Sequence, residues 1–161
     1  MSDAALRERA EAAVSSVPDP ELPFLTIAEL GILREVAVRD GIVEVAITPT
    51  YTGCVATSAI AADVAAALVA AGIEGARVRT VLSPAWTTSW LTEATRTKLL
   101  EAGIAPPGFV MRDGMFEAAA IACPRCGSLE TERLSAFGST PCKALHRCRA
   151  CREPFEAFKC L

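Results

Sequence analysis

The alternation of apolar and polar positions in the first third of the chain predicts a helix followed by a β-hairpin. Residues 2–16 carry Ala, Leu and Val at helical spacing, and Ser2 can cap this helix with its hydroxyl. Residues 33–39 and 42–48 each alternate apolar with polar side chains. An Asp-Gly dipeptide joins them, which is typical of a two-residue hairpin turn.

The next segments predict a second helix, a third strand and a third helix. Residues 54–71 are rich in Ala and end before a Gly, which is typical of a helix and its C-terminal cap. Residues 76–82 read as a strand, and Ser89 or Thr92 can begin a helix that ends near residue 102. The order hairpin, helix, strand predicts an α/β (α+β) fold, a small ββαβ-type domain with flanking helices.

The remaining residues predict a linker and a small β domain. Residues 104–118 contain Pro-Pro-Gly and Asp-Gly, a composition typical of linkers. Short strands are expected at 119–122, 131–136, 143–147 and 155–159. We therefore expect a first domain over 1–103, a linker over 104–118 and a β ribbon over 119–161.

Two pairs of cysteines in the ribbon have the spacing of metal ligands. Cys123 and Cys126 form one Cys-x-x-Cys pair, Cys148 and Cys151 form another, and 21 residues separate the pairs. Two such turns can place four thiolates around one ion, the tetrahedral arrangement of structural Zn²⁺. Gly127 supplies a backbone without Cβ where the first turn closes. The pattern therefore predicts a C-terminal Cys₄ zinc ribbon with structural Zn²⁺.

Two further ribbon thiols, Cys142 and Cys160, lie outside these pairs. They are either buried apolar residues or members of an iron–sulfur or metal-transfer site. The chain has seven Cys, an odd number, and four of them are accounted for as ligands rather than as a disulfide framework. This use of cysteine predicts a reducing, cytoplasmic setting.

Charge and hydropathy limit the partners. Residues 1–117 hold 9 Lys and Arg against 15 Asp and Glu, whereas residues 118–161 hold 7 against 4. The ribbon is therefore basic, but it lacks the dense basic run with interleaved aromatics that nucleic-acid binding requires, so protein docking is favoured. No stretch is long and apolar enough to span a membrane, and the N-terminal residues do not read as a signal peptide. We expect neither a nucleic-acid nor a membrane partner.

In the first domain, Cys54 and an acidic turn are the candidates for chemistry. Cys54 follows Gly53 at the predicted start of a helix, where the positive end of the helix dipole would stabilise a thiolate. It could ligate iron or attack an electrophile, or it could simply pack at the strand–helix junction. Asp19 and Glu21 flank Pro20 and could bind a metal or act as acid and base, but the residues alone favour a structural turn.

The aromatic residues and the single histidine exclude several functions. Trp86 and Trp90 are four residues apart and are interpreted as core or interface anchors rather than a stacking platform. His146 is the only histidine, so a His-based triad or a conventional di-iron site cannot form. With four thiolates already available, His146 is expected at an exposed strand position. No Gly-rich phosphate loop is present in the sequence.

Several of these motifs resemble known families. The first domain resembles SufT-type iron–sulfur assembly proteins, and nearly the whole chain, from about Val17, resembles the PaaD family of D subunits encoded with bacterial phenylacetyl-CoA epoxidase (phenylacetate-CoA oxygenase). The residues that carry the first resemblance are Asp19 to Glu21, Ile27 to Ile32, Thr48 to Cys54 and Ser83 to Trp86. Those that carry the second are Thr80 to Trp90, Cys123 to Gly127 and Phe137 to Leu145.

The resemblance implies an accessory protein of aerobic phenylacetate degradation that is not catalytic by itself. Its expected partners are the other epoxidase subunits, a di-iron oxygenase or an iron–sulfur reductase. It would mature or maintain an iron or iron–sulfur centre, with Cys54, Asp19 and Glu21 holding transient Fe or an Fe–S cluster. The alternative is a non-catalytic structural subunit of the oxygenase. This chain departs from the family in carrying Val55 where relatives often have Pro, and His146 where an aromatic is expected.

Overall fold

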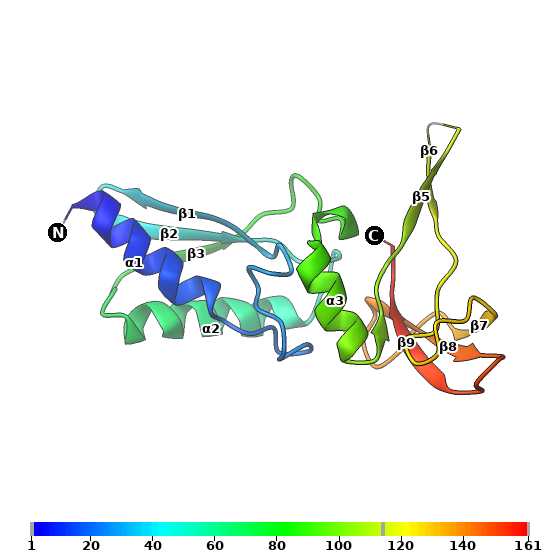
Figure 1. The fold of residues 1–161 in the computed structure, drawn as a ribbon. Helices are drawn as coiled ribbons and strands as arrows, with labels where there is room; N and C mark the ends of the chain where they lie inside the picture. Colours follow the sequence, from blue (N-terminus) through cyan, green and yellow to red (C-terminus); the bar gives the residue numbers. More distant parts are fainter. Residues whose placement is uncertain (1, 114, 161) are drawn as a thin grey trace. The chain divides into compact units, whose positions relative to one another are not determined.

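Backbone contacts divide the chain into two units, Met1–Trp86 and Thr87–Leu161, each built around its own sheet (Figure 1). A computed structural model describes residues 2–113 and 115–160, with the backbone alone for 109–112 and 116–118. The predicted mixture of helices and strands is confirmed. In the described part of the chain, no helix combines the length and apolar character that crossing a bilayer requires.

The sheet of the first unit contains the predicted hairpin. Strands β1 (Leu33–Arg39) and β2 (Ile42–Ile47) pair antiparallel, and β3 (Arg77–Thr80) pairs parallel to β2, which gives the order β1-β2-β3. Asp40 and Gly41 have φ of 52° and 74°, the left-handed values that a two-residue hairpin turn requires. The Asp-Gly dipeptide therefore predicted this turn correctly.

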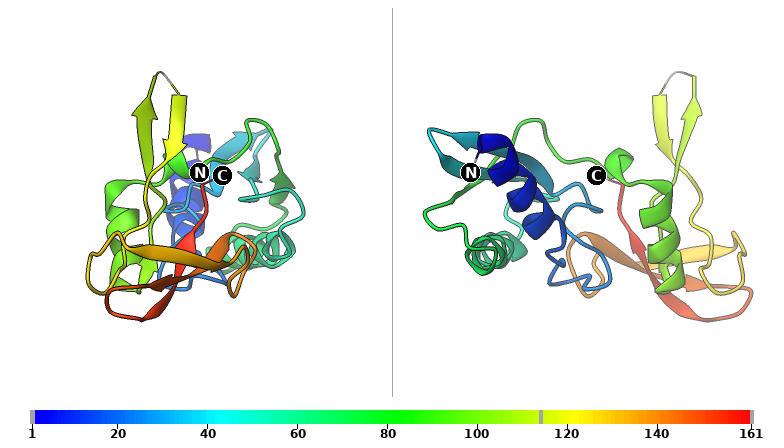
Figure 2. Two further views of the ribbon diagram at one scale, coloured as in Figure 1. Left: turned by 90° about the vertical axis from the view of Figure 1, so that its right-hand side faces the viewer. Right: turned by 60° about the vertical axis from the view of Figure 1, so that its left-hand side comes forward.

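Helices α1 (Asp3–Ser15) and α2 (Ala56–Ala70) lie on one face of this sheet (Figures 1 and 2). The Ser2 hydroxyl accepts a hydrogen bond from the Ala5 N–H at 3.3 Å, so the predicted cap is present. Apolar side chains from both helices and the central strand form the core of the unit. The fully or nearly fully buried members include Ala10, Val14, Val43, Val45, Ile60, Val64 and Leu68.

The opposite face of the sheet carries a ladder of ion pairs. Glu35 pairs with Arg79 at 2.6 Å, and Glu44 lies 3.4 Å from Arg39 and 3.8 Å from Arg77. The arginines and Glu35 are exposed and Glu44 is 22% exposed, so each pair contributes at most about 1 kcal/mol. The ladder marks this face as solvated and the helix-covered face as the core.

The second unit joins a helix to a four-stranded sheet. Helix α3 (Glu93–Glu101) follows a 3₁₀ turn and is capped by the Thr92 hydroxyl, which accepts from the Thr95 N–H at 3.1 Å. Of the two predicted starts, Thr92 is therefore correct. The sheet has the order β4-β9-β8-β7, with β4 parallel to β9 and the other pairs antiparallel. Its strands are β4 (Ile104–Ala105), β7 (Thr131–Ser135), β8 (Lys143–Cys148) and β9 (Pro154–Phe158).

Two expectations for the middle of the chain need correction. Residues 104–118, predicted to be a linker, contain β4 and a two-stranded hairpin of β5 (Phe109–Arg112) and β6 (Met115–Ala118). Residues 119–122 were predicted to be a strand but form none. The Ala119 N–H donates to the carbonyl of Gly108, which is not part of a strand, at 2.8 Å. The contacts also group α3 with the ribbon strands, while the predicted limits 1–103, 104–118 and 119–161 remain predictions.

A buried ion pair closes the loop between β7 and β8. The Lys143 side chain is 5% exposed, and its ammonium donates to Glu156 at 2.7 Å and to the Ser139 hydroxyl at 2.8 Å. Partial burial by itself would raise the pKa of Glu156, but the hydrogen bonds from Lys143 and Ser139 outweigh it and lower that pKa. A Cβ at Gly138 would lie 2.5 Å from Glu156 Oε1, so a larger residue there would displace this carboxylate from its present position.

The pairing of β4 with β9 generates a prediction about the limits of the folding unit. A chain of residues 87–161 should fold with metal, whereas a chain of residues 119–161 should be less stable, because it lacks β4 and the buried Ala105. Removal of a side chain buried in a small core costs about 2 kcal/mol or more. Thermal unfolding of both metal-loaded chains measures the difference, and equal midpoints would show that α3 and β4 do not belong to the ribbon fold.

Candidate metal centre and the Cys54 loop

The first thiol pair lies on a tight turn that its own backbone holds. The Gly127 N–H donates to the Cys123 carbonyl at 2.8 Å, and the Cys123 N–H donates to the Ser128 carbonyl at 2.9 Å. Gly127 has a φ of 75°, a left-handed conformation that residues with a Cβ rarely adopt. Gly127 therefore closes the turn that carries Cys123 and Cys126, as the sequence predicted.

The second thiol pair lies at the connection from β8 to β9. Cys148 is the last residue of β8, and its N–H donates to the Glu153 carbonyl at 3.0 Å, which closes the turn. The Cys151 N–H points at the Cys148 Sγ at 3.4 Å, an arrangement that stabilises a thiolate. Arg152 takes the left-handed position of this turn, with a φ of 66°.

The four thiols converge as the ligands of one ion. The Sγ atoms of Cys123 and Cys151 are 3.7 Å apart, those of Cys126 and Cys148 are 3.6 Å apart, and all four lie within 4.8 Å of one another. Four sulfurs placed 2.3 Å from a tetrahedral ion would be separated by about 3.8 Å. No disulfide forms among the described cysteines, and the donor set fits a tetrahedral thiolate-bound metal.

Without a bound metal, the two thiols of the second turn, Cys148 and Cys151, differ in pKa. The hydrogen bond from the Cys151 N–H is the largest cause that lowers the pKa of Cys148, to about 7. A backbone bond from Glu153 favours the Cys151 thiolate, but burial and the neighbouring thiols outweigh it and raise the pKa of Cys151 to about 12. One thiolate is thus available near neutral pH to begin capture of a metal, which must displace the other protons.

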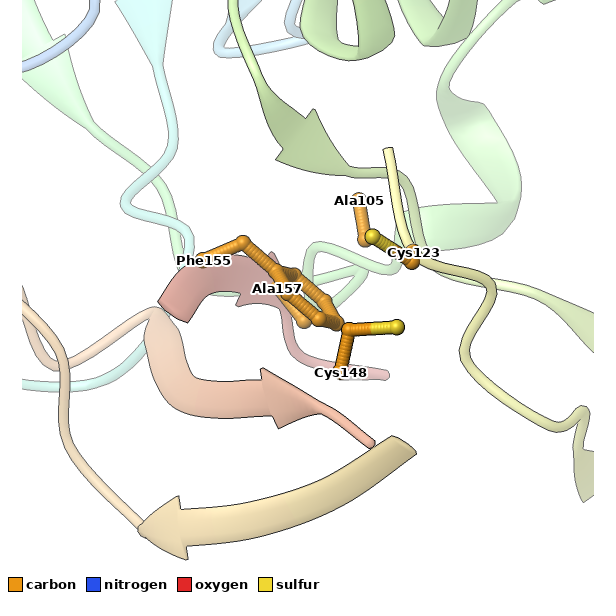
Figure 3. Close-up of a cluster of buried hydrophobic side chains, with 5 residues drawn as sticks. All are labelled: Ala105, Cys123, Cys148, Phe155 and Ala157. Carbon is orange, nitrogen blue, oxygen red and sulfur yellow. The ribbon is translucent and has the colours of Figure 1, made fainter. Parts of the chain in front are cut away.

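The thiols are also part of the apolar core of the ribbon. Cys123 and Cys148 are 2% and 0% exposed and pack in a cluster with Ala105, Phe155 and Ala157. In Figure 3, Cys123 lies beside Ala105 of β4, and Cys148 lies against the ring of Phe155. Metal ligands and core side chains are therefore the same residues, so the metal and the fold are coupled.

Arginines surround the thiol cluster and are held in part by glutamates. Arg149 donates to Glu132 at 2.8 Å, and Arg147 donates to the other oxygen of the same carboxylate. These two bonds, that from Arg149 being the larger, lower the pKa of Glu132. Arg125, in the first turn, lies 3.7 Å from Glu153. Four thiolates around a divalent ion carry a charge of −2, which this cationic surrounding offsets.

The remaining candidate residues of the ribbon lie outside the four-thiol cluster. Cys142 is buried, and its Sγ lies 3.1 Å from the Thr140 hydroxyl. Cys160 is partly buried and donates to the Gly108 carbonyl at 3.5 Å; burial raises the pKa of this thiol. His146 stacks on Phe155 with ring centroids 5.6 Å apart, and its buried Nδ1 has no hydrogen-bond partner among the described residues. Burial, then the charge of Arg133, lower the pKa of His146.

In the first unit, Cys54 lies between the end of β2 and the start of α2. It is partly buried and follows Gly53, whose φ of 86° turns the chain toward the helix. Its N–H donates to the Tyr51 carbonyl, and its carbonyl accepts from the Thr57 N–H, each at 3.2 Å. In the described structure no side chain caps α2, and its first turn holds no acidic residue, so the positive end of the helix remains available to an anion such as a thiolate.

The acidic turn is held by one of its own members. Asp19 is 6% exposed, and its Oδ1 accepts from the backbone N–H groups of Glu21 at 2.9 Å and Leu22 at 2.8 Å. This is the structural turn that the sequence left open beside a metal role. The Asp19 N–H also donates to the Leu25 carbonyl at 2.9 Å, which fixes the turn to the segment that leads into β1.

Strand register brings the acidic turn and Cys54 to the same end of the sheet. Leu33, at the start of β1, pairs with Ile47 at the end of β2, so the segment before β1 and the loop after β2 meet there. Trp86 is buried, and its indole N–H donates to the Leu30 carbonyl at 2.8 Å, so the predicted anchor role of Trp86 is supported. Among the described residues, the four ribbon thiols are the one group of three or more clustered ligand atoms, and joint action of Cys54, Asp19 and Glu21 stays a prediction.

Three supporting residues were not anticipated from the sequence. Glu132 accepts hydrogen bonds from Arg147 and Arg149, and Ala105 of β4 packs in the thiol cluster. The Thr131 hydroxyl donates to the Ile121 carbonyl at 2.8 Å, just before the first thiol turn. Glu132 lies between the two thiol pairs, but its arginine partners are 15 and 17 residues further along the chain, so sequence spacing did not indicate the contact. Ala105 was not detectable either, because nothing in its neighbours indicates pairing with a strand about 50 residues later.

Because ligands and core coincide, removal of the metal should unfold the ribbon. Chelation is expected to abolish amide exchange protection in β7, β8 and β9, since binding at such sites supplies on the order of 10 kcal/mol of folding free energy. Protection in β1 and β2 should be unchanged, because the core of their unit consists of aliphatic side chains. Hydrogen exchange followed by mass spectrometry measures both; retained protection in β8 after metal loss would contradict the coupling.

Replacement of His146 by phenylalanine separates a packing role from a ligand role. His146→Phe should keep the stack on Phe155 and remove the unsatisfied Nδ1, which raises the free energy of unfolding by about 1–2 kcal/mol. The metal content per chain should not change. A loss of metal in this variant would show that His146 participates in the site, and His146→Ala provides the control for loss of packing.

Comparison with known proteins agrees with this division of the chain. A family model described as the PaaD zinc beta ribbon domain matches residues 110–159, and one described as an iron-sulfur cluster assembly protein matches residues 7–83. A DUF59 domain from Bacillus anthracis aligns with a TM-score of 0.55 at 24% identity, over 60% of this chain and 93% of that chain. A conserved hypothetical protein from Thermotoga maritima aligns with a TM-score of 0.51 at 27% identity, over 62% and 98%.

A curated relative covers nearly the full length. The chain is 43% identical over 150 residues to an Escherichia coli (strain K12) protein named as the D subunit of 1,2-phenylacetyl-CoA epoxidase, with 93% of this chain and 90% of the relative aligned. The two matched domains, the four clustered thiols and this relative lead to one assignment. The chain belongs to the PaaD family, the D subunits of phenylacetyl-CoA epoxidase.

Proposed function

We propose that this chain is a cytoplasmic accessory protein of phenylacetyl-CoA epoxidase that matures or maintains an iron or iron–sulfur centre of the complex. The names of the relative and of the family model over residues 7–83 support this assignment. The free state of all seven cysteines is consistent with a reducing compartment. In this role the protein does not oxidise substrate by itself.

The observation that carries the proposal is the contrast between two thiol sites. The ribbon site is closed: four protein thiols fill a tetrahedron, which is typical of structural Zn²⁺ and leaves no position for a substrate. Cys54 is a single partly buried thiol at an uncapped helix start, without a cluster of further ligands among the described residues. A closed site suits a structural ion, whereas a single ligand suits transient binding.

The proposed mechanism is ligand exchange without a redox step. Cys54, just before the start of α2, holds an iron ion or a cluster through its sulfur, and exchangeable ligands fill the other coordination positions. Asp19 and Glu21 lie on the segment that reaches the same end of the sheet, so they supply acidic groups to that region. Ligands of the client displace Cys54, and the thiolate is released. The client is the di-iron oxygenase or the iron–sulfur reductase subunit.

Substitution of Cys54 tests this role. Anaerobically purified chain is incubated with iron-depleted epoxidase subunits, and iron, acid-labile sulfide and phenylacetyl-CoA epoxidation are measured. Cys54→Ser should lower iron transfer and recovered activity roughly tenfold or more, the scale on which loss of a group at a metal site acts. Cys142→Ser is the matched control, because it removes another thiol outside both sites.

Each variant must also retain its ribbon metal and its association with the other subunits. If Cys54→Ser supports normal iron content and activity, the maturation role is wrong and the alternative holds, a non-catalytic structural subunit of the oxygenase. The closed ribbon site and the basic ribbon surface are equally compatible with that alternative, which requires association but no transfer.

A further inference from the structure

One face of the ribbon sheet contains a groove. The cavity of about 540 Å³ is lined by residues of β7, β8 and β9 together with the segments after β6 and β9. Strand register explains its position: Arg133 of β7 lies opposite His146 of β8, and Ala144 of β8 lies opposite Ala157 of β9. Since residues opposite each other, or two apart on one strand, share a face, these residues line the same side of the sheet.

Small side chains form the floor of the groove. Ala144 and Ala157 are 5% and 2% exposed and lie side by side, and Ala136 and Ile121 add further apolar surface. Longer side chains at the two central positions would fill the space with the protein's own atoms. The groove is open to solvent, which suits an extended chain segment with an apolar side chain better than a fully enclosed small molecule.

The charges of the groove have one sign. Arg133 and Lys159 are its charged lining residues, and within the described part of the chain no carboxylate lines it. The Lys159 ammonium is held over the Phe137 ring, 4.2 Å from the centroid, and donates to the Pro141 carbonyl at 2.7 Å. Both cations thus lie beside the apolar floor. The floor suits an apolar side chain of a partner, and the cations add a preference for negative charge next to that side chain.

These two cations also differ from most others in the ribbon. Among the residues that the structure describes, neither Arg133 nor Lys159 has a carboxylate at salt-bridge distance, whereas four of the ribbon cations do: Arg125, Lys143, Arg147 and Arg149. Arg152 is the third unpaired one, and it lines a different cavity beside Glu132. Two of the three unpaired ribbon cations therefore lie at one apolar groove, and their charges are available to a carboxylate of a partner.

By contrast, the larger groove of the first unit lacks this one-sided charge. Its volume is about 720 Å³, and it runs between α1 and β1. Its lining mixes carboxylates with arginines, and Arg7 is already paired with Glu11 at 2.9 Å. Charge complementarity therefore singles out the ribbon groove.

We propose that the Arg133–Lys159 groove is a docking site for an acidic protein segment that places an apolar side chain on Ala144 and Ala157. The occupant is a segment of another epoxidase subunit, so this inference rests on the proposed association with that complex. Glutamates or aspartates beside the apolar residue pair with the two cations. Such rim charges chiefly govern the association rate and its dependence on salt, and the apolar contact governs dissociation.

Charge reversal in the full-length, metal-loaded chain tests the site. Binding of the purified remaining epoxidase subunits is measured by calorimetry at low and high salt for Arg133→Glu/Lys159→Glu and for Ala144→Leu, which fills the floor. The double reversal should weaken binding at least about tenfold and remove most of the salt dependence. Arg152→Glu is the matched control, since it reverses an unpaired ribbon cation outside the groove, and it should change affinity far less.

A chemical readout identifies the contact independently of affinity. A carbodiimide activates a carboxylate, and a neighbouring lysine amine in its neutral form then displaces a urea to form an amide, so treatment of the wild-type complex should link Lys159 to an Asp or Glu of another subunit. Metal content and thermal unfolding must match wild type in each variant used. Links from Lys159 to a second copy of this chain would assign the groove to a different occupant and overturn the proposal.

The outcomes separate this inference from the proposed function. Wild-type association that groove variants leave intact would overturn the inference alone. Loss of transfer in Cys54→Ser with normal docking would support maturation without bearing on the groove. Absence of wild-type association with every subunit would overturn both.

Discussion

The ribbon of this protein depends on four thiolates held at the distances of a tetrahedral ion. Its buried cluster contains five residues, and two of them, Cys123 and Cys148, are themselves ligands. The other members are two alanines and one phenylalanine, Ala105, Ala157 and Phe155, which bury little apolar surface. A core this small cannot offset the conformational entropy of ordering the strands, so metal coordination replaces the burial that larger domains obtain from aliphatic side chains. The parallel pairing of β4 with β9 extends this core beyond the thiol turns, because it brings Ala105 against Cys123.

The first unit offsets the conformational entropy of its strands by burying aliphatic side chains. Two helices cover one sheet face with aliphatic side chains, and the other face carries exposed ion pairs of small energetic value. No ion is needed to hold its strands together. The loops at the end of the sheet can therefore hold Cys54 and the acidic turn without a structural metal in this unit, and buried side chains such as Leu22 and Leu25 anchor the acidic turn in the core. Under the proposed function, this difference would let two thiol sites with opposite requirements coexist on one chain: the ribbon would keep its ion, and Cys54 would release one.

Local signals predicted the elements well, and distant pairings escaped them. The hairpin turn, the Ser2 and Thr92 caps and the two thiol turns depend on residues within four positions of one another, so sequence spacing was sufficient. The partnership of Ile104 and Ala105 with β9 depends on contacts across about 50 residues, and a Pro-Pro-Gly run beside it resembled a linker. Residues 119–122 form a short apolar run that was interpreted as a strand, yet the Ala119 N–H donates to Gly108 and the Ile121 carbonyl accepts from Thr131. The Phe137 to Leu145 motif had no physical explanation at the level of sequence; the buried Lys143–Glu156 pair and the crowded Gly138 supply one.

A protein that holds iron through a single ligand depends on its client more than a protein that supplies every ligand of the metal. A lone thiolate cannot outcompete the several ligands of a client centre, so transfer from Cys54 runs in the direction of the more complete site. The weakness of one ligand also makes the loaded state short-lived, and transfer then requires the client to be near before the metal is lost. Docking through a separate module raises the effective concentration of the client ligands without adding ligands to the carrier. Under the proposed function, a basic, metal-stabilised ribbon joined to an acidic unit would provide that separation: the proposed groove would set affinity, and Cys54 would set release.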